Sequence, residues 1–107
     1  MTTTIATRIS LPYEQIERFC QNWNITRMEV FGSVLRDDFN PERSDVDVLV
    51  TFAPGKTPGL AFFRAEKELA EILGREVEMS TRRAIEQSEN WMRRERILSE
   101  AQTIYGS

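Results

Sequence analysis

Residues 45–52 read Asp-Val-Asp-Val-Leu-Val-Thr-Phe, in which acidic and apolar side chains alternate at the start. Because the side chains of a β-strand point alternately to its two faces, this pattern predicts a strand with Asp45 and Asp47 on one face and valines on the other. The Cα atoms of the two aspartates would then lie about 7 Å apart. The apolar face requires a core to cover it, so we expect this strand to lie in the interior of a sheet.

Two carboxylates on one strand face repel each other. At a separation of about 4 Å the repulsion is roughly 4 kcal/mol for an effective dielectric constant of 20, so the arrangement is costly unless a positive group lies between them. A divalent cation would supply that charge. Mg²⁺ prefers oxygen ligands and commonly binds through one or two carboxylates together with substrate phosphates. A structural alternative stays open, in which both aspartates form the solvent face of an edge strand.

A second strand is expected at residues 25–31, directly before Gly32 and Ser33. Gly32 tolerates a positive φ where the strand ends, and Ser33 is suited to cap a short helix expected over residues 33–38. Backbone N–H groups and a hydroxyl at a helix N-terminus can bind phosphate. The two residues are therefore candidates for a phosphate-binding turn, the alternative being a strand end and a helix cap without a ligand.

The combination of Gly32-Ser33 with Asp45-Val46-Asp47 resembles the signature of the DNA-polymerase-beta-type nucleotidyltransferase superfamily. The short chain and its residues 31–36, Phe-Gly-Ser-Val-Leu-Arg, look most like the minimal nucleotidyltransferases (MNT), which include antitoxins paired with HEPN toxins. The resemblance covers residues 25–105. Eleven residues separate Ser33 from Asp45, one more than is usual in the minimal group.

The resemblance also requires a third carboxylate on the next strand, which we expect at residues 75–81. Glu78, between Val77 and Met79, matches that position with glutamate in place of the usual aspartate. Glu76 lies two residues earlier on the same strand face and competes for the role, and both glutamates would also suit an exposed edge. A displacement of about 1 Å can lower a catalytic rate on the order of a hundredfold, so the longer side chain puts turnover in question.

The resemblance implies an enzyme that uses ATP and Mg²⁺. Gly32 and Ser33 would hold the nucleotide phosphates. Arg36, on the helix that follows, would reach the phosphates or instead pair with Asp37 or Asp38, and we expect it to support the structure rather than to bind the nucleotide.

The same resemblance assigns catalysis and metal binding to Asp45, Asp47 and Glu78. The two aspartates would hold Mg²⁺, and Glu78 would help to ligate a second ion during turnover and accept the acceptor's proton. The acceptor implied is a tyrosine of a cognate HEPN ribonuclease toxin, bound in a hetero-oligomer and silenced by AMP. Two alternatives stay open: an antitoxin that neutralises its partner by binding alone, and nucleotidyl transfer to a small molecule.

Composition excludes several function classes. The chain has no histidine and a single cysteine, Cys20, so it offers no Ser–His or Cys–His nucleophile pair and no Cys/His zinc site. A formal net charge of −3 gives no general attraction to nucleic acid. No apolar run is long enough to span a membrane and no signal peptide is recognisable. We expect a cytoplasmic protein that binds neither membranes nor free nucleic acid.

The remaining pattern is mostly helical, and residues 1–107 are expected to form a single domain of mixed α/β class. A helix after Ser10 would bury residues at helical spacing, Cys20 among them. A second helix over residues 60–73 would turn Phe62 and Phe63 inward and end at Gly74. These elements predict a small mixed sheet of about three main strands with helices packed over it, in the order helix, strand, helix, strand, helix, strand, helix.

From Thr81 onward the chain is expected to be helical, with a break near residues 88–90. An apolar stripe would run along this segment, and an arginine cluster beside it would be mostly a solvated face or else contact an acidic partner or a toxin. The stripe comprises Trp91, Ile97, Leu98, Ala101, Ile104 and Tyr105, and the cluster comprises Arg82, Arg83, Arg93, Arg94 and Arg96.

Overall fold

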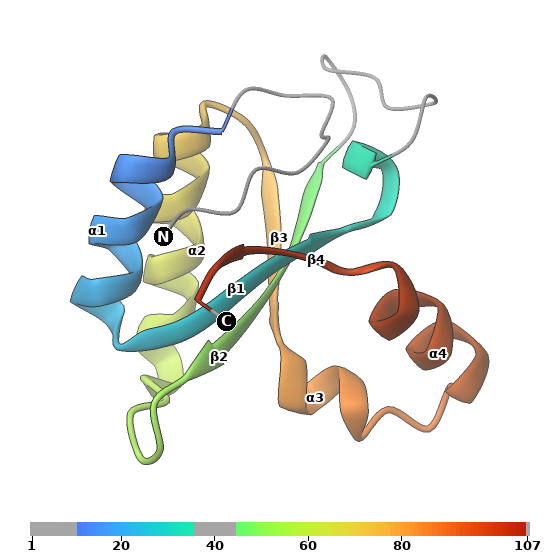
Figure 1. The fold of residues 1–107 in the computed structure, drawn as a ribbon. Coiled ribbons are helices and arrows are strands. Elements are labelled where there is room, and N and C mark those ends of the chain that lie inside the picture. The colour runs from blue at the N-terminus through green and yellow to red at the C-terminus, as the bar shows by residue number, and fades with distance from the viewer. Residues whose placement is uncertain (1–10, 36–44, 107) are drawn as a thin grey trace.

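A four-stranded sheet forms the centre of the protein in a computed structural model that describes residues 11–35 and 45–106 (Figure 1). The strand order is β3-β2-β1-β4; β1 is antiparallel to β2 and β4, and β2 is parallel to β3. The mixed α/β fold and the interior position of the acidic strand are confirmed. The strands are β1 (Ile25–Phe31), β2 (Val46–Phe52), β3 (Val77–Thr81) and β4 (Gln102–Tyr105).

The fourth strand corrects the prediction of a helix up to Tyr105. Helix α4 (Trp91–Glu100) ends before Ala101, and residues 102–105 pair with β1 instead. The physical reason is the free edge of β1, which offers hydrogen-bond partners to the β-branched residues of this segment.

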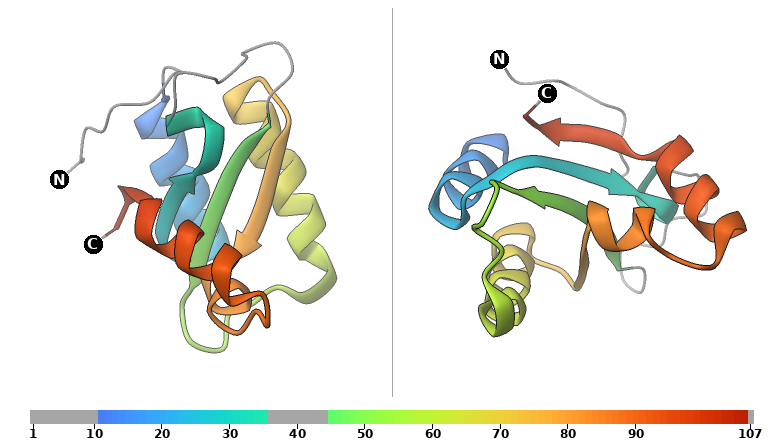
Figure 2. Two further views of the ribbon diagram at one scale, coloured as in Figure 1. Left: turned by 90° about the vertical axis from the view of Figure 1, so that its right-hand side faces the viewer. Right: turned by 90° about the horizontal axis from the view of Figure 1, so that it is seen from below.

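Helices cover both faces of the sheet (Figures 1 and 2). Helices α1 (Tyr13–Trp23) and α2 (Phe62–Leu73) lie on one face, and α3 (Arg82–Glu86) and α4 lie on the other. Short 3₁₀ helices, η1 (Gly32–Leu35) and η2 (Gly59–Ala61), follow β1 and precede α2. Among the described residues, none of the helices combines the length and apolar character that crossing a membrane requires.

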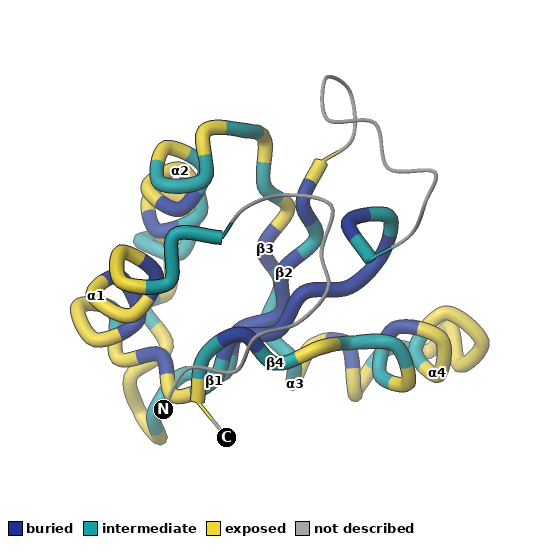
Figure 3. Tube along the Cα trace, turned by 45° about the horizontal axis from the view of Figure 1, so that its top comes forward, coloured by how far each residue is buried: buried dark blue, intermediate teal, exposed yellow. Residues whose placement is uncertain are grey.

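The alternation in β2 separates two apolar clusters. Buried residues of β1 and β2 lie at the centre of the trace (Figure 3). The valines of β2 face α1 and α2, where they pack with residues such as Ile16, Phe19 and Leu69. Leu49 faces the other way and packs with Phe31, Ile85 of α3 and Ile97 of α4. Alternate side chains of β2 therefore pack against different helices, one set on each face of the sheet.

The burial and capping predicted for single residues agree with the structure at some positions and differ at others. Cys20 is buried in the core as expected, and burial raises its pKa to about 12, which removes it as a nucleophile at neutral pH. Gly74 ends α2 with a left-handed C-cap, as predicted. Phe63, predicted to face inward, is 67% exposed, and Trp91, predicted as part of the apolar stripe, is 62% exposed. Phe62, rather than Phe63, turns toward Phe52.

The predicted helix at residues 33–38 is described only as far as Leu35, where it is a 3₁₀ helix rather than an α-helix. Its remainder, including Arg36, lies outside the described residues, as does Ser10.

A buried ion pair fastens α3 to the sheet. Glu29 of β1 is 2% exposed, and both of its carboxylate oxygens accept hydrogen bonds from Nη1 of Arg82 at 2.8 Å. Arg27 lies 3.5 Å from the same carboxylate and donates to Thr103 of β4. Arg82, expected on a solvated face, is therefore a structural residue.

Candidate active site

The three predicted carboxylates lie on one face of the sheet, where β2 and β3 run side by side. Asp47 and Glu78 are register partners in the parallel pairing, so they lie on the same face of neighbouring strands, which are about 4.8 Å apart. Asp45 directly precedes β2, two residues from Asp47 along the strand direction. This face is the one that α3 and α4 cover, opposite the valines of β2.

Gly32 lies against Asp47, although fifteen positions separate them in the chain. Phe31 and Asp47 are register partners, so Gly32 follows directly after the residue beside Asp47. Gly32 has a φ of +80°, and a Cβ built on it would meet Oδ2 of Asp47 at 2.5 Å. Only glycine combines this conformation with such a close approach of a carboxylate. The Gly-Ser turn therefore lies beside the acidic strand.

The carboxylate of Asp47 lies in unfavourable surroundings for a negative charge. Burial, followed by the charges of Glu78 and Asp45, raises its pKa from 3.8 to about 6. Glu100 adds to this effect, and Arg93 opposes it. A cation bound here would relieve the excess negative charge.

Arg93 and Glu100 both belong to α4 and were not predicted as site residues. They stand four residues before and three residues after the buried Ile97, so all three share one face of the helix. Glu100 accepts a hydrogen bond from the backbone N–H of Gly32 at 3.1 Å. The i, i+4, i+7 spacing was visible in the sequence, but only the packing of Ile97 shows which face meets the sheet.

The carboxylate oxygens have the donor chemistry that Mg²⁺ prefers. Within residues 11–35 and 45–106, however, no three His, Cys, Asp or Glu side chains gather closely enough to form a complete metal cage. An ion at this position would need further ligands, such as substrate phosphates, which Mg²⁺ commonly uses together with one or two carboxylates. Asp47, with its raised pKa, is the residue whose surroundings favour a cation most directly.

The other predicted site residues differ in their accessibility. Asp45 and Glu78 are exposed, and Ser33 is partly buried in η1. Glu76, the competitor of Glu78, is exposed and precedes β3, where its carbonyl accepts a hydrogen bond from Val46 at 3.0 Å. Glu78 is therefore the better placed of the two beside Asp47.

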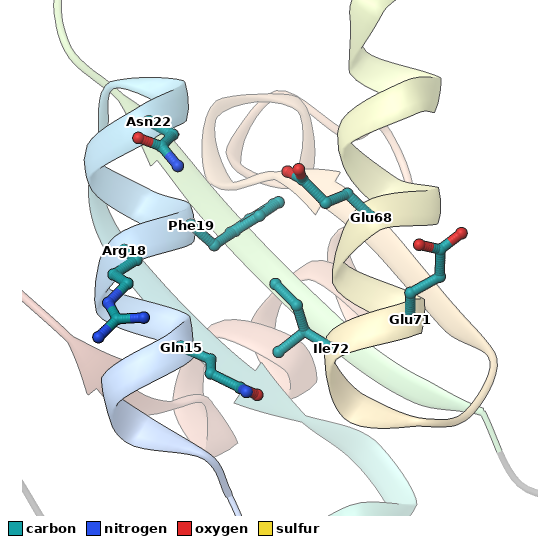
Figure 4. A pocket seen from close by; sticks show the side chains of 7 residues that line it. All are labelled: Gln15, Arg18, Phe19, Asn22, Glu68, Glu71 and Ile72. Carbon is teal, nitrogen blue, oxygen red and sulfur yellow. The ribbon is translucent and has the colours of Figure 1, made fainter.

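A separate hollow of about 520 Å³ lies between α1 and α2, on the sheet face opposite Asp47 (Figure 4). Phe19 and Ile72 point toward each other across it, and charged side chains of both signs line its rim. Glu68 at this rim accepts a hydrogen bond from the indole of Trp23, which ties α1 to α2. The hollow is a seam between two core helices and lies apart from the carboxylates.

Comparison with known proteins decides the family. A model of the nucleotidyltransferase domain matches residues 13–104, which include both the Gly-Ser turn and the acidic strands. The chain belongs to the nucleotidyltransferase family. A protein of Methanocaldococcus jannaschii, named "putative protein adenylyltransferase", is 39% identical over 77 residues, which cover 72% of this chain and 76% of that protein.

Two solved structures resemble this nucleotidyltransferase closely in fold. A structure described as a "putative minimal nucleotidyltransferase" is 33% identical with a TM-score of 0.64, covering 84% of this chain and 86% of that chain. A complex of tri-AMPylated Shewanella oneidensis HEPN toxin with MNT antitoxin matches with a TM-score of 0.59 and 15% identity, covering 89% of this chain and 70% of that chain. The resemblance to the minimal nucleotidyltransferases is thereby confirmed.

Proposed function

We propose that this nucleotidyltransferase transfers AMP from ATP to a tyrosine hydroxyl of a cognate HEPN toxin, in a reaction that depends on Mg²⁺. The observation that carries the proposal is the position of Asp47, held against Gly32 and beside Glu78 with a pKa raised to about 6. The name of the M. jannaschii relative supports AMP as the transferred group. The complex of MNT antitoxin with AMPylated HEPN toxin supports the class of partner.

The proposed roles follow from the chemistry of each group. Gly32 and Ser33 would donate hydrogen bonds to the phosphates of ATP from the N-terminal end of η1. Asp45 and Asp47 would hold Mg²⁺, and Glu78 would share in a second ion. We also propose, from the sequence alone, that Arg36 supports the structure of this turn or contacts the phosphates of ATP.

In the proposed reaction, the tyrosine oxygen bonds to the α-phosphorus while the bond from that phosphorus to the oxygen bridging the α and β phosphates breaks. Pyrophosphate leaves, and the tyrosine proton passes to a carboxylate, for which Glu78 is our candidate. Mg²⁺, when bound, would neutralise the charge of the phosphates, which together with positioning provides most of the catalysis of such transfers. Glu78 is exposed, so a protein acceptor can approach it.

We further propose that the protein acts in the cytoplasm within a hetero-oligomer. Its cysteine is free and buried, which suits a reducing compartment. The negative net charge supports a protein acceptor over a nucleic acid.

The test uses the purified partner toxin with ATP and Mg²⁺, followed by intact-mass spectrometry. Wild-type protein is expected to add one or more AMP units. Glu78→Gln should abolish this mass gain while leaving complex formation nearly intact, because a single carboxylate contributes little to a protein interface but is needed for proton transfer. Glu76→Gln is the matched control and should retain activity. Glu78→Asp, which restores the family's usual residue, should retain or improve it.

The competing function is neutralisation by binding alone, favoured by the longer glutamate at position 78. A wild-type protein that binds and inhibits the toxin without ever adding mass would establish that function and reject the transferase. Loss of activity in Glu76→Gln with retention in Glu78→Gln would keep the enzyme and move the third carboxylate two residues back.

A further inference from the structure

A protein carboxylate already occupies one of the donors that the proposed function assigns to a nucleotide phosphate. The backbone N–H of Gly32 donates to Oε1 of Glu100 at 3.1 Å. A carboxylate and a phosphate oxygen are both anionic acceptors, and both form strong hydrogen bonds with backbone N–H groups. Glu100 thus makes the contact that the proposed function assigns to ATP.

The position of Glu100 is fixed by the fold. Val30 of β1 is the antiparallel partner of Gln102 of β4, and moving two residues outward from this pair leads to Gly32 on one side and Glu100 on the other. Ile97, one turn earlier in α4, is 2% exposed and packs against Phe31. Two independent constraints, strand register and helix packing, therefore bring this carboxylate to the Gly-Ser turn.

The charge of Glu100 would also act on a bound nucleotide. A triphosphate that enters the site would add negative charge next to Glu100 and would compete for the same N–H group. Glu100 and the phosphate cannot both remain there without strong repulsion.

We propose that Glu100 is an internal placeholder for a substrate phosphate: it accepts the hydrogen bond of the Gly32 N–H until the triphosphate of ATP binds and displaces it. This inference rests on the proposed function and adds a residue that sets the affinity for the nucleotide. The side chain of Glu100 would keep the Gly-Ser turn in a conformation that accepts an anion. Because Glu100 competes with the phosphate, the affinity for the nucleotide would be lower.

The test is calorimetric titration of the whole chain with ATP and Mg²⁺, and separately with inorganic triphosphate. Glu100→Gln keeps an oxygen acceptor but removes the charge, so it should bind both ligands about fivefold to tenfold more tightly than wild type. Glu95→Gln is the matched control, because it removes the same charge from an exposed position on the same helix. It should leave both affinities within about twofold.

A second readout follows the amide signal of Gly32 by NMR. In wild type this signal should shift when triphosphate binds, and in Glu100→Ala without ligand its hydrogen exchange should become faster, because the acceptor is gone. Unchanged exchange in Glu100→Ala would overturn the proposal, as would equal triphosphate affinity in Glu100→Gln and wild type. Weaker binding in Glu100→Gln would also overturn it and would assign Glu100 to the holding of Mg²⁺.

The same titrations separate this inference from the proposed function. One outcome is that wild type binds ATP, that the double variant Asp45→Ala with Asp47→Ala does not, and that Glu100→Gln has no higher affinity than wild type. This outcome rejects the placeholder role of Glu100 and leaves the proposed transferase function intact. Failure of wild type to bind either ligand rejects both.

Discussion

Gly32 has two reasons to be glycine, and they can be separated by experiment. Its φ of +80° disfavours any side chain, and a Cβ would in addition collide with Oδ2 of Asp47. Gly55 has a similar φ of +75° with nothing within 4 Å of the same hypothetical atom. Gly32→Ala should therefore lose about 2 kcal/mol of unfolding free energy and most of its affinity for ATP with Mg²⁺.

Gly55→Ala is the control and should lose about 1 kcal/mol while binding ATP normally. Urea unfolding gives the free energies, and calorimetry gives the affinities. Equal ATP affinity in wild type and Gly32→Ala would contradict a phosphate-binding role for the turn.

Asp47 makes stability depend on pH in a defined direction. Its pKa is higher in the folded protein, about 6, than its ordinary value of 3.8, so folding favours the protonated form. The part of the unfolding free energy that depends on protonated Asp47 is fully present below about pH 4. It is lost as the pH rises through about 6. Asp47→Asn should consequently raise the unfolding free energy by about 1 kcal/mol at pH 7, a value discounted for the half-exposed side chain.

The gain of Asp47→Asn should vanish near pH 4, which urea unfolding at a series of pH values would show. The exposed Glu95→Gln serves as control and should show no comparable dependence. Addition of Mg²⁺ should narrow the difference between Asp47→Asn and wild type at pH 7. A constant difference at all pH values would show that Asp47 acts through packing rather than charge.

At the level of single residues, the sequence was most informative for candidate site residues that belong to the same strand. Alternation predicted Asp45 and Asp47 on one face. The family resemblance predicted Glu78, which is the register partner of Asp47 in the structure. Arg93 and Glu100 could not be predicted, because their meeting with the site depends on how α4 packs. The sequence pattern within one segment was sufficient to predict which residues share a strand face. It was not sufficient to predict contacts between segments.

Among the elements, α3 depends on the ion pair between Glu29 and Arg82. Arg82→Met would leave the Glu29 carboxylate buried with Arg27 3.5 Å away as its remaining cation among the described residues. Removal of one partner of a buried pair is strongly destabilising, so we expect a loss of about 3 kcal/mol in urea unfolding. A double variant with methionine at both positions should recover much of that loss.

The control for this experiment is Arg18→Met, which breaks an ion pair with Glu14 on the surface of α1. Both of those side chains are largely exposed, so the loss should stay below about 0.5 kcal/mol. A loss in Arg82→Met as small as in this control would mean that α3 is held by Ile85 and its apolar contacts alone.

The predicted bounds of β1 agree with the structure, because Gly32 marks the end of the strand and the apolar pattern marks its length. β4 was missed for a physical reason. The spacing of Ile97, Ala101 and Ile104 fits a helix, but pairing with the free edge of β1 outweighs this local pattern for residues 102–105.

At the scale of the whole molecule, β4 joins the end of the described chain to its first strand. Ile104 is 4% exposed and packs in the cluster that includes α1. Ile104→Ala should cost about 3 kcal/mol of unfolding free energy, because it removes buried volume at this junction. The exposed Gln102→Ala on the same strand should cost less than about 0.5 kcal/mol.

Urea unfolding of the two variants would check this prediction. Similar free energies for both would show that β4 contributes little to the core and that the sheet is held mainly by its other three strands. The arrangement of the helices on two faces was not predictable in detail, since it depends on which residues of β2 each helix covers.

The register of β2 also limits how this protein can change by insertion and deletion. Removal of one residue within β2 would exchange the two faces of the strand on one side of the change, sending valines toward α4 or carboxylates into the core under α1 and α2. Substitutions alter one contact, whereas a change of length here alters every contact beyond it. Length differences among relatives should therefore fall between the strands, as the additional residue between Ser33 and Asp45 does.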